Sequence, residues 1–163
     1  MRIRHATMAD AAETTRILNH YVLHSNARFD VEPFRVEDRL DWMAGFDPAG
    51  RWRMFVAEMD AGLAGYACTQ PYRPGKAFDH SVEVSIYLDP AARTRGLGSR
   101  LYERLFDGLG DAGVHRALAG IAQPNPASMA LHRKFGFVEV GTFSEYAIKH
   151  GVYISSTWME KRF

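Results

Sequence analysis

The hydrophobic pattern along the chain changes between two periods, and each period predicts one kind of element. Strict alternation of apolar and polar residues from Val82 to Leu88 is typical of a half-buried strand, which we expect over residues 80–88. An apolar residue at every fourth position from Leu97 to Leu109 indicates an amphipathic helix, which Gly110 closes. Residues 117–122 form a wholly apolar run, as in a strand that is buried on both faces.

Applied to the remaining chain, the same patterns give the order of the elements. We expect helices over residues 7–24, 36–46 and 126–136, and strands over 2–6, 51–58, 63–69, 137–146 and 152–160. The order β-α-α-β-β-β-α-β-α-β-β predicts an α/β fold, with helices on both faces of one sheet. Because a helix connects the strands at 80–88 and 117–122, those two strands should run parallel.

The composition is that of one ordinary globular domain, which we expect to span residues 1–163. Apolar residues make up 47% of the chain and charged residues 24%, which argues against disorder and coiled coil. The formal net charge is +1, so the charge balance favours neither nucleic acid nor an anionic membrane as a partner.

Cysteine usage and the start of the chain bear on metal binding and on the compartment. Cys68 is the only cysteine, which excludes a disulfide within the chain and a cysteine-held zinc, so we expect no metal. The residues from Met1 to His5 lead into a polar segment, unlike a secretory signal, and no run approaches the roughly 18 apolar residues of a membrane span. We therefore expect a cytoplasmic protein.

The segment Arg93-Thr94-Arg95-Gly96-Leu97-Gly98 lies between the strand at 80–88 and the following helix. Its two glycines let the backbone turn tightly and approach a ligand without a Cβ in the way. Free N–H groups at the helix start, with Arg93 and Arg95, form an anion site suited to pyrophosphate. The spacing is neither the dinucleotide-binding G-x-G-x-x-G nor a P-loop. The alternative is a glycine-containing turn with solvated arginines.

Glu83 lies within the alternating strand, about twelve residues before these glycines. Alternation places Glu83, Ser85 and Tyr87 on one face of that strand, among apolar neighbours that indicate partial burial. Burial raises the pKa of a carboxylate toward the range of a general base. The alternative is an outward-facing acid on a half-exposed strand.

Three polar residues follow the apolar strand at 117–122. Ser128 and His132 are four residues apart, hence on one helix face, and Asn125 precedes them at the strand's end. This face would line a cleft at the carboxyl ends of the two parallel strands, where α/β sheets bind ligands. The alternative is that Asn125 only caps the helix and that His132 is a surface histidine.

Together these motifs resemble the GNAT acyltransferase superfamily over the whole chain. Its R-x-x-G-x-G pattern matches the segment from Arg93 to Gly98, and its N…L-Y-x-x-x-G-F pattern matches Asn125, Leu131, His132, Gly136 and Phe137, with His132 at the usual tyrosine position. The resemblance implies a mixed, mostly antiparallel central sheet with a splayed parallel strand pair.

Three further motifs are similar to phosphinothricin N-acetyltransferase and the methionine sulfoximine and sulfone acetyltransferases. They are Asn19-His20-Tyr21, Val82-Glu83 and Lys149-His150-Gly151. Two features depart from this subfamily. Its substrate loop carries two basic residues, whereas this chain has Arg73 and then Gly75, with Lys76 as an imperfect substitute. Val152-Tyr153-Ile154 also replaces the usual basic or tryptophan residues, which puts phosphinothricin itself in question.

The resemblance implies direct transfer of acetyl from acetyl-CoA to the primary amine of a small amino-acid-like substrate. Glu83 would be the general base, and His132 would protonate the departing thiolate or act as an alternative base. The implied cofactor-binding residues are Ile86, Tyr87, Leu88, Arg93, Thr94, Arg95, Gly96, Leu97, Gly98, Ser99, Asn125 and Ser128. The implied substrate-binding residues are Phe29, Arg73, Gly75, Glu83, Val84 and Ser85. Relatives of this type are commonly homodimers, so we expect one here.

Other functions remain open on the sequence. One is acetylation of protein or peptide amines, which would call for an open acidic groove. A second is a non-catalytic acyl-CoA-binding module, and a third is a structural partner that binds no CoA. An acyl-cysteine route through Cys68 is disfavoured, because no base lies near it in sequence.

Overall fold

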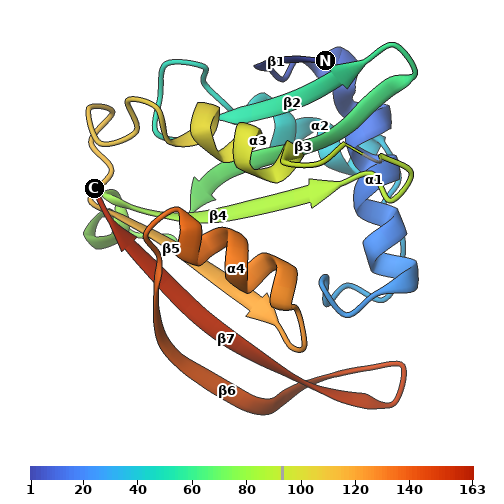
Figure 1. Cartoon of the computed structure of the whole chain (residues 1–163), viewed down its shortest axis with the longest axis vertical. Helices are drawn as coiled ribbons and strands as arrows, with labels where there is room; N and C mark the ends of the chain where they lie inside the picture. The colour runs from blue at the N-terminus through green and yellow to red at the C-terminus, as the bar shows by residue number, and fades with distance from the viewer. Residues whose placement is uncertain (93) are drawn as a thin grey trace.

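One mixed sheet organises the molecule (Figure 1). The computed structural model describes residues 1–92 and 94–163. Its seven strands lie in the order β1-β2-β3-β4-β5-β7-β6. Their bounds are β1 Arg2–His5, β2 Met54–Met59, β3 Gly62–Pro71, β4 Ser81–Leu88, β5 Arg116–Ala122, β6 Val138–Lys149 and β7 Val152–Arg162.

Helices cover both faces of this sheet, as the element order predicts. They are α1 Ala11–His24, α2 Leu40–Ala44, α3 Leu97–Phe106 and α4 Pro126–Lys134. Alternate residues of β2 and β3 pack in opposite directions: Val56 and Tyr66 lie with α1 and α2, whereas Phe55 and Ala67 lie with α3. The predicted α/β fold is therefore confirmed.

The pairing of β4 with β5 confirms the predicted parallel strands and their splaying. All other strand pairs of the sheet are antiparallel. The parallel pair is short, and its last paired positions are Glu83 and Leu118. Beyond them β4 continues to Leu88 along β3, and β5 continues to Ala122 along β7, so the two strands separate (Figure 1).

All four helices are shorter than the hydrophobic pattern predicts: α1 begins at Ala11 after a 3-10 turn, Met8–Asp10, and α4 ends at Lys134. The segment expected as a helix over 36–46 is a 3-10 turn, Glu37–Arg39, followed by α2, and Pro48 lies just beyond. The helix from Leu97 ends at Phe106 because Asp107 leaves the helical conformation and Gly108 has a φ of +62°. Leu109 is nevertheless fully buried, since the turn after α3 carries it back to the core.

The sheet ends in a long hairpin of β6 and β7 (Figure 1), in which β7 pairs with β5 and Lys149, near the turn, is buried against the loop after α1. The strand predicted from Arg51 begins at Met54 instead.

No helix among the described residues is long and apolar enough to cross a membrane.

Candidate active site

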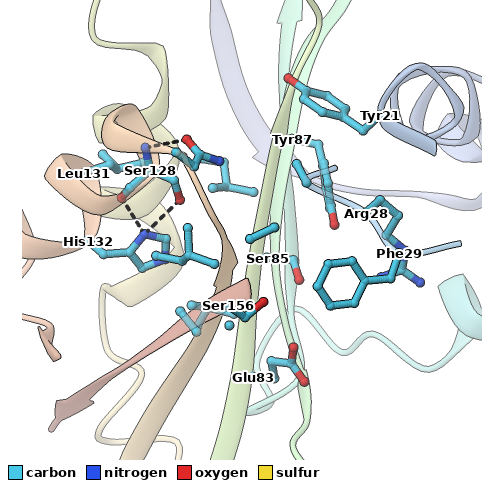
Figure 2. Close-up of a pocket in the computed structure, with 18 of the residues that line it drawn as sticks. Tyr21, Arg28, Phe29, Glu83, Ser85, Tyr87, Ser128, Leu131, His132 and Ser156 are labelled. Atoms are coloured by element: carbon cyan, nitrogen blue, oxygen red, sulfur yellow. Dashed lines mark hydrogen bonds between the residues drawn. The ribbon is translucent and has the colours of Figure 1, made fainter. Parts of the chain in front are cut away.

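The site is a cavity of about 770 Å³ at the point where β4 and β5 separate. One wall comes from α4, and the other comes from residues 27–30, which follow α1. Figure 2 shows Ser128 and His132 on one side of the opening, Arg28 and Phe29 on the other, and Ser85 between them. Beyond their short pairing, the two parallel strands separate, and the backbone groups on their facing edges have no strand partner. Such groups are available to a ligand.

Glu83 is the last residue of β4 that pairs with β5, and it lines the cavity where the two strands begin to separate. Burial raises the pKa of its carboxyl, and the nearby Arg28 guanidinium partly offsets that rise. No side chain among the described residues forms a hydrogen bond or an ion pair with this carboxylate. A half-buried acid with a raised pKa and free oxygens is suited to accept a proton from a ligand.

The predicted substrate residues divide into two groups. Phe29, Val84 and Ser85 line the cavity together with Glu83. Arg73 and Gly75 do not line it: the exposed Arg73 stacks over the Tyr72 ring at 5.0 Å, and Gly75 lies in the surface turn before a 3-10 helix. The structure therefore does not bring Arg73 to Glu83, and its role in substrate binding stays a prediction.

The cavity wall that follows α1 is a loop, residues 25–34, which hydrogen bonds hold at both ends. The Lys149 ammonium donates hydrogen bonds to the carbonyl oxygens of Ser25 at 2.8 Å and Arg28 at 2.7 Å. The Asn19 amide donates to the Phe34 carbonyl at 2.8 Å and accepts from the Phe34 N–H at 2.9 Å. Two motifs noted in the sequence, around Asn19 and around Lys149, thus hold the loop that carries Phe29.

On the opposite wall, His132 is enclosed by protein partners. Its Nδ1 lies 2.8 Å from the Ser128 carbonyl oxygen, and its Nε2 lies 2.8 Å from the Tyr102 hydroxyl (Figure 2 shows the Ser128 contacts). Because a carbonyl only accepts, Nδ1 carries the proton and Tyr102 donates to Nε2. Burial lowers the pKa of the ring, so the neutral form is favoured.

The interpretation of His132 as a surface histidine is wrong, since its exposed fraction is 3%. The interpretation of Asn125 as a cap is confirmed: its side chain accepts a hydrogen bond from the Ser128 N–H at 3.1 Å. Asn125 and Ser128 also line the cavity. Whether His132 transfers a proton stays a prediction.

The edge of β4 beyond Glu83 supplies backbone groups to the cavity. Ile86, Tyr87 and Leu88 line it, and this stretch has β3 on one side and no paired strand on the other. The Leu88 carbonyl already accepts a hydrogen bond from the Tyr21 hydroxyl at 2.7 Å. The remaining edge groups are placed to bind an extended, amide-containing ligand as an added strand would.

The start of α3 has the geometry of an anion site. Gly96 precedes the helix with a φ of +75°, a conformation that L side chains rarely adopt. A Cβ at Gly98 would lie 3.1 Å from Leu131 Cδ2, so this glycine lets α3 pack against the cavity wall. Lys134 donates to the Ser99 hydroxyl at 2.8 Å and adds a cation beside the helix start.

The other predicted residues of this segment are Thr94, Arg95 and Leu97. Thr94 and Arg95 precede the helix, whereas the Leu97 side chain is 1% exposed and packs in the core, so only its backbone can face a ligand. Arg93 lies outside the described residues, and its predicted role is not tested. The fit to a pyrophosphate therefore depends on the N–H groups of the first helical turn, on Gly96 and on the Lys134 ammonium near Ser99.

Several cavity residues were missed by the sequence analysis. Trp158 lines the cavity from β7, and its buried indole N–H has no partner among the described residues. A Cβ at Gly120, its neighbour on β5, would lie 2.9 Å from the indole ring. A glycine inside an otherwise apolar strand was the available signal for such a close approach. Tyr102, Tyr146 and Arg28 gave no comparable signal.

Cys68 is not suited to covalent chemistry. Cys68 is 1% exposed, and burial raises the pKa of its thiol to about 12, so it is protonated and inert at neutral pH. No cluster of three His, Cys, Asp or Glu side chains suited to a metal occurs among residues 1–92 and 94–163.

Comparison with known proteins agrees with this geometry. The model of the acetyltransferase (GNAT) family matches residues 15–137. The chain is 43% identical to a phosphinothricin N-acetyltransferase of Streptomyces coelicolor over 99% of its own length and 95% of that protein.

Solved structures show the same architecture. A ribosomal-protein-alanine N-acetyltransferase of Brucella melitensis superposes with a TM-score of 0.93 at 34% identity, over 100% of both chains. A phosphinothricin acetyltransferase of Sinorhizobium meliloti in complex with acetyl-CoA superposes with a TM-score of 0.92 at 29% identity, over 99% of this chain and 88% of that one. By family match, sequence identity and fold, the chain belongs to the GNAT family of acetyltransferases.

Proposed function

We propose that this enzyme transfers acetyl from acetyl-CoA to the primary amine of a small amino-acid-like substrate, such as phosphinothricin, methionine sulfoximine or methionine sulfone. Residues 1–163 act as one catalytic domain, in the cytoplasm. The observation that carries the proposal is the half-buried Glu83 carboxylate, free of protein partners, which lines the cavity where β4 and β5 begin to separate. The 43% identity to a phosphinothricin N-acetyltransferase supports the substrate class.

The residues of the site fit acetyl-CoA, which when bound supplies a thioester as the acyl donor. The first-turn N–H groups of α3, with Gly96 and Lys134 nearby, hold the diphosphate. The unpaired edge of β4 from Ile86 to Leu88 holds the pantetheine amides and directs an N–H toward the reacting carbonyl oxygen.

Glu83 prepares the nucleophile. An amino acid arrives as an ammonium, which must lose a proton before its lone pair can attack. Glu83 accepts that proton directly or through one water, because its oxygens are free and burial raises its pKa. Phe29, Val84 and Ser85 surround the position that the amine takes beside it.

The role we propose for His132 is narrower than that of Glu83. As the neutral imidazole, bonded at both nitrogens, it orients Tyr102 and holds α4 against the cavity. Protonation of the leaving thiolate by this pair would have to use the Tyr102 hydroxyl proton, and the neutral His132 ring has no proton on Nε2 with which to replace it. A bulk water is the simpler proton source.

A thiol-release screen tests the proposal. Acetyl-CoA is incubated with the enzyme and with free methionine sulfoximine, methionine sulfone, phosphinothricin and ordinary amino acids. We expect release of CoA thiol with at least one free amino acid. If acetyl-CoA raises the melting temperature but no amine releases thiol, the chain is an acyl-CoA-binding module. If acetyl-CoA does not raise the melting temperature and no amine releases thiol, the cofactor assignment also fails.

Peptide amines are the second candidate substrates, since the Brucella structure is of a ribosomal-protein-alanine N-acetyltransferase. A peptide must leave the cavity past the pinned loop that carries Phe29. A panel of peptides with different N-terminal residues, run beside the free amino acids, separates the two. Faster thiol release with peptides than with any free amino acid would favour this second candidate.

We also propose that the enzyme is a homodimer that uses the β6–β7 hairpin. Large apolar side chains on this hairpin are between 49% and 64% exposed, and they are Val138, Val140, Phe143, Tyr146, Ile148, Val152 and Tyr153. Large exposed apolar side chains gathered on one edge hairpin are typical of an interface. Light scattering should give twice the chain mass, and a Val140→Lys, Tyr153→Lys double variant should be monomeric.

A further inference from the structure

A second cavity, of about 250 Å³, adjoins the first on the Glu83 face of β4. Arg28, Ser85 and Tyr87 line both cavities, so they form the boundary between them. The second cavity extends from this boundary toward Arg39 and Trp42. Nothing in the acetyl-transfer chemistry described above uses it.

Arg39 lines this second cavity and carries hydrogen-bond donors that have no acceptor among the described residues. The residue is 6% exposed, yet its Nε and Nη2 are buried and have no partner among the described residues. Buried guanidinium N–H groups without acceptors carry a desolvation cost, and proteins seldom leave them so. An acceptor delivered by a ligand would remove that cost.

The aromatic neighbours of Arg39 do not satisfy these donors. Its guanidinium carbon lies 3.9 Å from the centre of the Trp42 ring and 5.5 Å from that of Phe34. Such contacts stabilise the cation through the faces of the rings and fix the guanidinium plane. The N–H groups at the guanidinium edge remain available for an acceptor in that plane, which suits a bidentate oxyanion.

The other ionisable groups around the second cavity leave its charge positive. The Asp38 carboxylate is held by Arg35 at 2.8 Å, and Arg28 is paired with Asp30. Burial raises the pKa values of the Cys68 thiol and the Tyr66 hydroxyl, so both are neutral at pH 7. Arg39 is thus the cation that lacks a counter-charge among the described residues of this cavity.

We propose that the second cavity is an oxyanion subsite in which Arg39 binds the carboxylate or phosphinate at the end of the substrate's side chain. The enzyme then prefers amino acids with acidic side chains. This inference rests on the proposed acetyl transfer to an amino acid, and it adds Arg39 as a basic group for acid recognition, since the exposed Arg73 lines neither cavity.

The geometry assigns the side-chain acid, not the α-carboxylate, to Arg39. The α-carboxylate is attached to the carbon that bears the amine, so it stays beside Glu83 when the amine does. Glu83 lines the first cavity but not the second. A group that reaches past Ser85 into the second cavity must therefore lie several bonds farther from the amine.

The test compares glutamate with glutamine, which have the same shape and differ in charge, and phosphinothricin with methionine sulfoximine. Arg39→Met keeps the bulk against Trp42 and removes the donors. We expect kcat/KM for glutamate and phosphinothricin to fall by about 10- to 100-fold, as expected for lost hydrogen bonds to a charged group. For glutamine and methionine sulfoximine it should change by less than about threefold. Arg39→Lys should recover part of the loss, because it restores charge without the fork.

Arg104→Met is the matched control, since Arg104 lies on α3 with a side chain 53% exposed. It should leave both substrate pairs unchanged. Equal losses for charged and neutral substrates in Arg39→Met would show that Arg39 only braces Trp42, and the inference would be wrong. Unchanged activity toward all four substrates would overturn it as well.

A binding measurement separates this inference from the proposed function. Glutarate has the glutamate side chain without the amine, so it cannot be acetylated. If no amine is acetylated by the enzyme, acetyl transfer to amino acids fails, and calorimetry with glutarate then decides the subsite alone. Binding to the wild-type enzyme that Arg39→Met weakens at least tenfold would support the subsite, while equal or absent binding would refute it.

Discussion

Two parts of the cavity lining, the α4 wall and the wall formed by strand β4, differ in how their polar groups are satisfied. On the α4 wall, His132 has Ser128 on one nitrogen and Tyr102 on the other, and Asn125 caps the helix. On the β4 wall, Glu83 has no side-chain partner in the described chain, and behind it Arg39 keeps two buried nitrogens unpaired. Native proteins satisfy nearly all buried polar groups, so an unpaired group that lines a cavity is a candidate for contact with a ligand. The α4 wall holds the site together, and the β4 wall binds and reacts.

The largest effect expected from this difference is on Glu83. Glu83→Gln keeps the shape but removes the proton acceptor, so kcat should fall by about 10²- to 10⁴-fold. The melting temperature should stay the same or rise, because a half-buried charge is lost. Stopped-flow or steady-state thiol release measures the turnover.

The pH profile sharpens this result. Glu83 works only when deprotonated, so kcat/KM should fall as pH drops through its raised pKa, and this limb should vanish in Glu83→Gln. Glu103→Gln, an exposed acid on α3, serves as the control and should behave as the wild type. Unchanged turnover of Glu83→Gln across the pH range would remove Glu83 from the mechanism.

The next effect concerns the start of α3. Gly98→Asp adds a carboxylate beside the first-turn N–H groups, where it repels a diphosphate, and we expect acetyl-CoA affinity to fall by about 100-fold. Gly98→Ala separates bulk from charge: its Cβ meets the flexible Leu131 side chain at 3.1 Å, so affinity should change little. Calorimetry with acetyl-CoA measures both, and wild-type affinity in Gly98→Asp would contradict the cofactor assignment.

The parts of the fold that follow from local periodicity were predictable from the sequence. β4 alternates because Val82 and Val84 pack in the core while the opposite face of the strand faces α1. The apolar run of β5 predicted a strand buried on both faces, and this is wrong: Ala117, Ala119 and Ile121 are buried, but Leu118 is half-buried and Gly120 is exposed. The end of α3 was not predictable from its leucines. Leu109 continues the helical spacing, but a turn at Gly108 buries it from another direction, so the pattern extends past the helix.

The residues of the site likewise divide into those that the sequence could predict and those that it could not. Glu83, Ser85 and the residues from Asn125 to His132 lie on single elements, where spacing fixes the face that each presents. Arg28, Arg39 and Trp158 reach the cavities only through tertiary packing of distant segments. In sequence, Arg39 is one charge on a short helical segment, and nothing local distinguishes it from a solvated arginine such as Arg35.

A smaller effect is expected at the loop after α1, which carries Phe29 into the cavity lining. Lys149→Met removes the ammonium that holds the Ser25 and Arg28 carbonyls, so the loop carrying Phe29 loosens. The KM for the amine should rise by about tenfold while kcat changes less, since a charged hydrogen bond of ~1.5 kcal/mol corresponds to that factor. Steady-state kinetics at saturating acetyl-CoA tests this, with Lys161→Met, which loses a bond to Phe135 far from the loop, as the control. A drop in kcat with KM unchanged would mean that the loop does not bind the substrate.

The smallest effect on turnover is expected at the α4 wall, where both nitrogens of His132 have hydrogen-bond partners. Tyr102→Phe leaves His132 Nε2 buried without a donor, which should cost about 1–3 kcal/mol of stability and change kcat by less than about threefold. A loss of kcat as large as that of Glu83→Gln would instead assign proton transfer to the Tyr102–His132 pair.

His132 should also make the stability of the protein depend on pH. Its pKa is lowered in the folded state, so below the unfolded-state pKa of about 6.5 the unfolded chain binds one more proton than the folded chain. The free energy of unfolding therefore falls as pH decreases through that window. His132→Gln should flatten this part of the stability curve in urea titrations between pH 7 and 5, because the variant has no ring to protonate, and its turnover should still follow the titration of Glu83.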